Sequence, residues 1–97
     1  MSRASIQRKL RQVNDRLLRA REELGVLQQQ LLTFVEVADD TRVRSLVSDD
    51  PSERVEHQEA SRHAEVMTRS RDRVSQTITE LERLRDELLD RLLLEAR

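Results

Sequence analysis

Apolar residues recur along the first part of the chain with a strict alternation of four- and three-residue gaps. The pattern begins at Ile6 and continues to Ala38 without a break. This spacing is the a/d heptad pattern of a coiled coil, sustained here for more than four heptads. It predicts an amphipathic helix from about residue 3 to residue 38. The apolar positions of this helix are Ile6, Leu10, Val13, Leu17, Ala20, Leu24, Leu27, Leu31, Phe34 and Ala38.

The heptad pattern stops at residue 39, and a signal for a new helix follows at Asp50. Asp50 is a good N-cap residue, Pro51 suits the first helical position, and Glu53 has the spacing of a capping box. Because Pro51 disfavours helical geometry at Asp50, residues 39–50 are predicted to form a hinge rather than to continue one long helix. The apolar residues of this hinge are expected to plug the end of the hairpin: Val43, Leu46 and Val47.

A second helix is predicted from Pro51 to about Glu95. Between Met67 and Leu92 its apolar residues repeat about every 3.6 residues, the period of a helix that supercoils little. Two polar residues, Ser70 and His63, fall on or near this stripe. The stripe consists of Val55, Ala60, Ala64, Met67, Val74, Ile78, Leu81, Leu84, Leu88 and Leu92.

The distribution of charge favours antiparallel pairing of the two helices. Residues 1–21 carry seven basic residues and one acid, whereas the end of the second helix is rich in acids. A register in which Ala38 lies opposite Pro51 places Arg3 near Asp86, so that the two charged ends neutralise each other. Each such exposed pair contributes at most ~1 kcal/mol, but together they select one orientation. The predicted fold is therefore all-α: an antiparallel two-helix coiled-coil hairpin.

Several leucines and a valine lie off the predicted stripes. A two-helix hairpin buries little apolar surface, and small domains of this kind are often stabilised by oligomerisation. The sequence therefore predicts a homodimer that forms a four-helix bundle, or docking onto the helices of another protein. The alternative is that these residues only widen the stripes. The predicted self-association residues are Leu18, Leu32, Val35, Leu89 and Leu93.

Composition limits the chemistry and the location of the protein. Charged residues make up 38% of the chain, the net charge is −1, and there is no cysteine. Disulfides and thiolate metal sites are thereby excluded, and no apolar run approaches the ~20 residues that span a bilayer. We expect a cytoplasmic location. The single glycine, Gly25, lies inside the first helix as a tolerated defect or as a place where another helix approaches closely.

The sequence contains no arrangement of side chains typical of catalysis or of metal binding. The two histidines, His57 and His63, are six residues apart and do not stack on one helix face. We expect no catalytic residue, no metal and no cofactor. The arginine-rich start of the chain could face phosphates, but the absence of tyrosine and tryptophan and the neutralising acids argue against direct binding of nucleic acid.

The predicted hinge is acidic and is the first candidate for a protein contact. Acids at the start of a helix suit its dipole, but Asp39 and Asp40 stand where the first helix is expected to end. The predicted contact residues are Asp39, Asp40, Arg42, Arg44, Asp49 and Asp50. We therefore expect a non-catalytic coiled-coil interaction protein that acts as a scaffold, adaptor or regulator by contacting another protein.

Two resemblances suggest an alternative function in transcription. A helical hairpin with acids at its tip resembles the Gre-type transcript-cleavage factors, which implies that Asp39, Asp40, Asp49 and Asp50 engage RNA polymerase. The spacing of Ser5, Arg8 and Gln12 is similar to part of the cyclic-di-GMP-binding motif of certain actinobacterial anti-sigma coiled coils, which implies a sigma factor as partner. That motif continues with an aspartate where this chain has Arg16.

Overall fold

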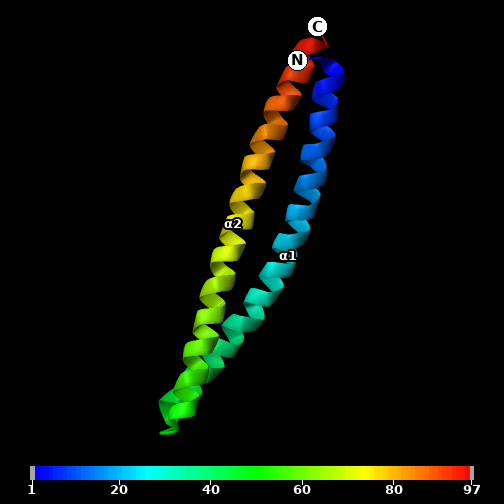
Figure 1. The fold of residues 1–97 in the computed structure, drawn as a ribbon. Coiled ribbons are helices and arrows are strands. Elements are labelled where there is room, and N and C mark those ends of the chain that lie inside the picture. Colours follow the sequence, from blue (N-terminus) through cyan, green and yellow to red (C-terminus); the bar gives the residue numbers. More distant parts are fainter. Residues whose placement is uncertain (1, 97) are drawn as a thin grey trace. The chain divides into compact units, whose positions relative to one another are not determined.

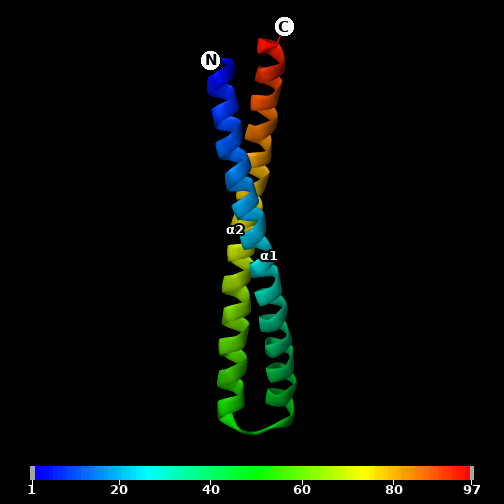
Figure 2. The same ribbon diagram turned by 90° about the vertical axis from the view of Figure 1, so that its right-hand side faces the viewer.

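The computed structural model describes residues 2–96 and contains two long α-helices joined by a short connection (Figure 1). Helix α1 spans Arg3–Val47 and helix α2 spans Pro51–Glu95. Figure 2 shows the connection, residues 48–50, crossing from the end of α1 to the start of α2. The helices run antiparallel, so the predicted all-α hairpin is confirmed. Neither helix, over the described residues, carries a stretch long and apolar enough to cross a membrane.

The end of α1 lies farther along the chain than its apolar pattern predicts. The helix does not stop at Ala38 but continues to Val47, so the predicted hinge at residues 39–50 is wrong and only three residues make the turn. The heptad spacing also continues, but with polar residues: Thr41 is buried, and Ser45 and Ser48 are half-buried. These small side chains occupy positions that face α2, and for that reason the apolar pattern ended early while the helix did not.

Each helix is preceded by a residue whose oxygen atoms accept hydrogen bonds from the first turn. The carbonyl and hydroxyl oxygens of Ser2 accept hydrogen bonds from the first turn of α1, over distances of 3.0 and 3.2 Å. Asp50 caps α2 through its carboxylate, which accepts from the Ser52 N–H at 3.0 Å. The Asp50 N–H donates to the Ser48 hydroxyl at 3.1 Å rather than to Glu53. The predicted N-cap is thus confirmed, whereas the capping box is not formed, because the Glu53 N–H donates to the Asp50 carbonyl oxygen at 3.2 Å.

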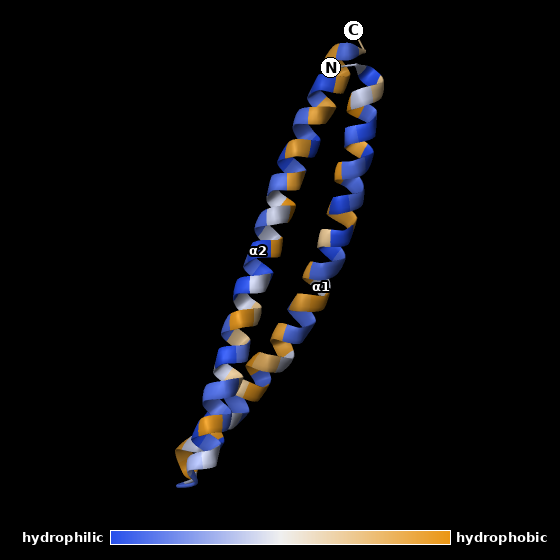
Figure 3. Ribbon diagram, in the orientation of Figure 1, coloured by the Kyte–Doolittle hydropathy of each residue, from blue (hydrophilic) through white to orange (hydrophobic). Residues whose placement is uncertain are grey.

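Packing divides the hairpin into two units. Unit 1 combines the start of α1, up to Leu24, with α2 from Val74 onwards, and unit 2 runs from Gly25 to Arg73. Unit 1 has an aliphatic core, in which each fully buried leucine, isoleucine or valine side chain contributes roughly 1.5–3 kcal/mol. In Figure 3 hydrophobic residues recur at intervals along both helices. The buried residues of this core are Ile6, Leu10, Val13, Leu17, Ala20, Ile78, Leu81 and Leu88.

The face that α2 turns towards α1 differs from the predicted stripe. Buried and half-buried positions recur along α2 with alternating gaps of four and three, which is a regular heptad rather than a 3.6-residue repeat. Four of these seam positions hold polar or charged residues: Glu53, His57, Arg71 and Arg85. Long side chains of this kind can lie along an apolar surface with only their charged ends in water. Val55 and Leu84 are exposed and do not belong to the seam.

Unit 2 has a thinner core than unit 1. Its buried residues are Leu31, Thr41 and Ala60. Phe34 is half-buried and makes a T-shaped contact with the His63 ring, with 5.4 Å between ring centroids and 81° between planes. Small and polar side chains at the seam bury less apolar surface, so this unit has the weaker hydrophobic contribution to stability.

The register of the two helices also differs from the predicted one. Asp86 does not reach Arg3, as predicted, but pairs with its neighbour Arg85 at 3.2 Å. An interhelical ion pair in unit 1 joins Arg21 to Glu82, with 3.6 Å between nitrogen and oxygen. Because α1 continues beyond residue 38, each of its residues faces a partner farther along α2 than the early turn implied. Charge favoured the correct orientation but did not determine the alignment.

Candidate protein-interaction surfaces

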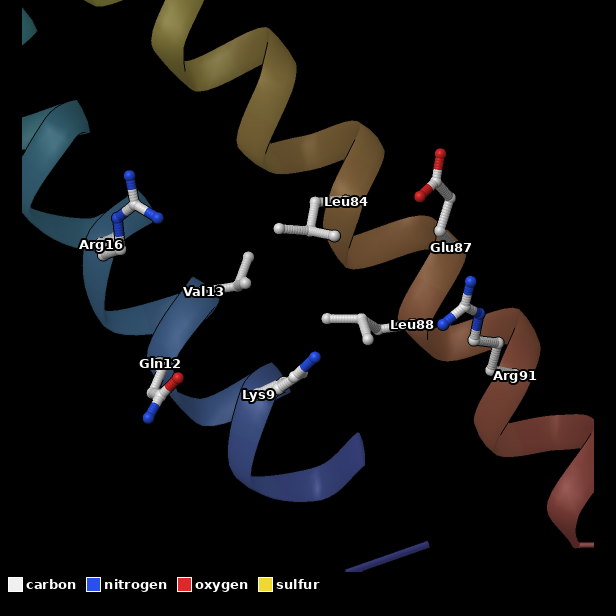
Figure 4. A pocket seen from close by; sticks show the side chains of 8 residues that line it. All are labelled: Lys9, Gln12, Val13, Arg16, Leu84, Glu87, Leu88 and Arg91. Carbon is white, nitrogen blue, oxygen red and sulfur yellow. The ribbon is translucent and has the colours of Figure 1, made fainter. Parts of the chain in front are cut away.

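A groove of about 300 Å³ lies along one flank of unit 1, between α1 and α2. Its floor is aliphatic: Val13 from α1 and Leu84 and Leu88 from α2 point towards each other across the space between the helices (Figure 4). Leu84 remains 39% exposed, so the floor is open to solvent. The volume is at the lower end of the range for pockets that bind ligands. We call this feature the cationic groove, lined by Lys9, Gln12, Val13, Arg16, Leu84, Glu87, Leu88 and Arg91.

Three cations and one acid surround the floor of the cationic groove. Lys9 and Arg16 flank Val13 on α1, while Glu87 and Arg91 flank Leu88 on α2 (Figure 4). Across the described residues, the ion pairs of unit 1 join Arg21 to Glu82 and Arg85 to Asp86. No carboxylate within that part of the chain lies in ion-pair distance of the three groove cations. The expectation that the acids of α2 neutralise the basic start of α1 therefore fails at this groove.

The residues of the predicted acidic hinge are dispersed rather than gathered at a tip. Asp39 and Asp40 lie inside α1, about two turns before its end. Asp40 pairs with Arg44 at 3.2 Å, and Arg44 also reaches Glu56 on α2 at 3.9 Å. Only Asp49 and Asp50 lie in the connection itself. Arg42 is exposed on α1.

The acidity of the Asp50 carboxylate departs from its usual value. A hydrogen bond from the Ser52 backbone N–H, followed by one from the Ser52 hydroxyl, lowers the pKa of Asp50. Both donors favour the charged form of the carboxylate. This shift is explained by helix capping, so Asp50 has a structural role at the start of α2.

Comparison of this chain with protein-family models, with characterised proteins and with solved structures finds no match.

Aliphatic residues near the hinge do not plug the end of the hairpin as predicted. Val43, Leu46 and Val47 are 52%, 72% and 82% exposed. At 100° per residue they share the outward side of α1 with Glu36, Asp39 and Asp40, all of which are exposed. We call this set of six the acidic face of α1: Glu36, Asp39, Asp40, Val43, Leu46 and Val47. It combines aliphatic side chains with negative charge on one side of a helix.

The five predicted self-association residues are exposed. Leu18, Leu89 and Leu93 belong to unit 1, and Leu32 and Val35 belong to unit 2. Leu32 and Val35 lie one turn apart, as do Leu89 and Leu93, but Asn14 and Arg21 lie one turn to either side of Leu18, so the apolar surface does not form a continuous stripe along α1. A four-helix bundle needs such a stripe along each helix, so the predicted bundle remains a hypothesis that this surface supports poorly.

Neither histidine belongs to a cluster of metal-binding side chains. Within residues 2–96, no three residues of the types that bind metals gather closely enough to hold an ion. His63 packs against Phe34 at the edge of the seam. His57 lies on the seam itself, where its Nδ1 faces the Ala38 carbonyl oxygen at 3.2 Å and the Thr41 hydroxyl at 3.4 Å.

The spacing of two pairs of residues indicates the cationic groove, although these residues lie outside the apolar pattern. Lys9 and Arg16 are seven residues apart on α1, and Leu84 and Arg91 are seven apart on α2. Residues at this spacing lie above one another on one side of a coiled coil, beside the a/d seam. Recognising that the two pairs share a flank requires the register of the helices, which the sequence did not determine correctly.

Proposed function

We propose that this protein is a non-catalytic coiled-coil interaction protein and that its cationic groove binds an acidic amphipathic helix of a partner. The observation that carries the proposal is the open aliphatic floor of Val13, Leu84 and Leu88, with Lys9, Arg16 and Arg91 around it and no ion pair to them from the described part of the chain. A groove between two helices commonly binds a third, amphipathic helix, whose apolar face packs against the floor of the groove.

The chemistry of the groove specifies what kind of helix fits. Leucine-like side chains bury against the floor and supply apolar contact, worth about 25 cal/mol per Å² of apolar surface removed from water. Glutamates or aspartates beside them then reach Lys9, Arg16 and Arg91. Exposed charges at the edge of an interface contribute more to partner choice and association rate than to affinity. An acidic helix is thus preferred over a basic one with the same leucines.

Fluorescence anisotropy with a labelled synthetic peptide tests this function. The probe is an amphipathic helical peptide with leucines on one face and glutamates beside them, and its control carries lysines in place of the glutamates. We expect saturable binding of the acidic peptide and much weaker binding of the basic one. The double variant Lys9→Glu with Arg16→Glu should raise the dissociation constant of the acidic peptide about tenfold or more.

A matched variant separates groove binding from general attraction by positive charge. Arg8 and Arg11 are exposed on the same stretch of α1 but do not line the groove. Arg8→Glu with Arg11→Glu changes the net charge equally and should leave binding within about twofold at moderate salt, because screening weakens distant charges. Equal losses in both double variants, or equal binding of both peptides, would refute a specific site in the groove.

A further inference from the structure

The chain carries on its own surface a helix face of the kind that the cationic groove would accept. The acidic face of α1 presents three acids and three aliphatic residues within an arc of roughly 120°. No basic residue lies within that arc, since Arg42 and Arg44 project to its two sides. The aliphatic members Val43, Leu46 and Val47 are exposed, as a docking surface requires.

The two surfaces carry opposite charges, and the acidic face is long enough to span the groove. The groove offers Lys9, Arg16 and Arg91 around its floor, and the face offers Glu36 and Asp39. Asp40, the third acid of the face, forms an ion pair with Arg44, with 3.2 Å between nitrogen and oxygen. From Lys9 to Arg16 the groove extends roughly 10 Å along α1, and the acidic face extends roughly 16 Å from its first residue to its last.

We infer that the occupant of the cationic groove is the acidic face of α1 from a second copy of this chain. In this contact, Val43, Leu46 and Val47 rest on the aliphatic floor, while Glu36 and Asp39 of the same copy approach the groove cations of the other. The two surfaces are different, so the contact is heterologous. The inference rests on the proposed function, because it names the partner of the same groove.

A contact of this size implies reversible association that depends on salt. A standard stable interface buries about 1,600 Å², and one short helix face against an open groove buries less. The ionic part weakens as the Debye length falls from about 10 Å at 0.1 M salt to about 3 Å at 1 M. The contact is therefore expected to show itself as concentration-dependent self-association at low salt that declines at high salt.

Sedimentation velocity of the full chain over a range of concentrations, at about 0.1 M and about 1 M salt, tests the inference. The groove variant is Lys9→Glu with Arg16→Glu, and the face variant is Glu36→Lys with Asp39→Lys. Each should weaken self-association about tenfold or more by placing like charges opposite each other. An equimolar mixture of the two variants should associate again, because the reversed charges of one match those of the other.

The control is Arg8→Glu with Arg11→Glu, which should associate like the unaltered chain. Helical content and melting of every variant, followed by circular dichroism, identify any that fail to fold. A chain that stays monomeric at all concentrations overturns the inference, as does a mixture of the two variants that does not associate. A monomeric chain that still binds the synthetic acidic peptide would leave the proposed function standing and remove only the second copy as partner.

Discussion

The Nδ1 atom of His57 on α2 lies 3.2 Å from the carbonyl oxygen of Ala38 on α1. A carbonyl oxygen only accepts, so Nδ1 carries the proton of this contact. The Thr41 hydroxyl lies 3.4 Å from the same nitrogen and donates to the Val37 carbonyl oxygen at 2.8 Å. A polar layer of this kind fixes the register of a coiled coil at some cost in stability.

Replacing the histidine of this layer should therefore stabilise the protein. His57→Leu removes a polar seam residue, and the Ala38 carbonyl oxygen keeps its bond within α1. We expect the free energy of unfolding to rise by roughly 1 kcal/mol. Urea unfolding followed by circular dichroism measures the change. The exposed His63→Leu is the matched control, with an expected effect within about 0.5 kcal/mol. A lower urea midpoint for His57→Leu would mean that the polar layer is a net source of stability.

Gly25 is a second position where stability can be gained. A Cβ atom added there meets nothing within 4 Å, which removes the close helix approach that the sequence allowed as an alternative. Gly25→Ala should stabilise the chain by about 1 kcal/mol, because alanine lowers the conformational entropy of the unfolded state. Differential scanning calorimetry should show a higher Tm. Gly25→Pro, which breaks the helix, should lower it by more; an unchanged Tm in both variants would contradict a continuous α1 at this position.

Two adjacent leucines in unit 1 provide a test of the seam. Leu17 is 2% exposed in the core, and Leu18 is 59% exposed. Leu17→Ala should cost about 2–5 kcal/mol through the lost apolar contact and the cavity. Leu18→Ala should change the stability by about 0.5 kcal/mol or less. Chemical denaturation compares the pair, and Leu17→Val gives a milder change if the alanine variant does not fold. Similar costs at the two positions would contradict the assigned seam.

The charged cap at Asp50 predicts that the stability of the protein depends on pH. Because its pKa is lowered from an ordinary value of 3.8, the charged cap stabilises the folded state fully above that value. This contribution is lost as the pH falls through the lower pKa of the folded state. Asp50→Asn keeps an oxygen acceptor but does not titrate. The difference in Tm between the unaltered chain and Asp50→Asn should therefore diminish as the pH is lowered through this region. A difference independent of pH would argue against the charged cap.

The heptad of α1 and the start of α2 could be predicted from the sequence because each depends on local chemistry. The alternating gaps from Ile6 to Ala38 define one apolar side of a helix whatever lies beside it. Asp50 and Pro51 define a helix start through the hydrogen-bonding capacity of one and the fixed backbone of the other. These signals were sufficient to predict two helices, and the distribution of charge along the chain favoured their antiparallel pairing.

The end of α1, the seam of α2 and the groove were decided only by the tertiary structure. A seam position is one that faces the other helix. Thr41, His57 and Arg71 occupy such positions although they are not apolar. The pattern of apolar residues alone therefore predicts too early an end for α1 and a shifted register. The cationic groove depends on that register, because Lys9 and Arg91 lie on different helices and share a flank only when α1 and α2 are correctly aligned. Local propensity specified the helices, whereas contact between them specified which side chains meet.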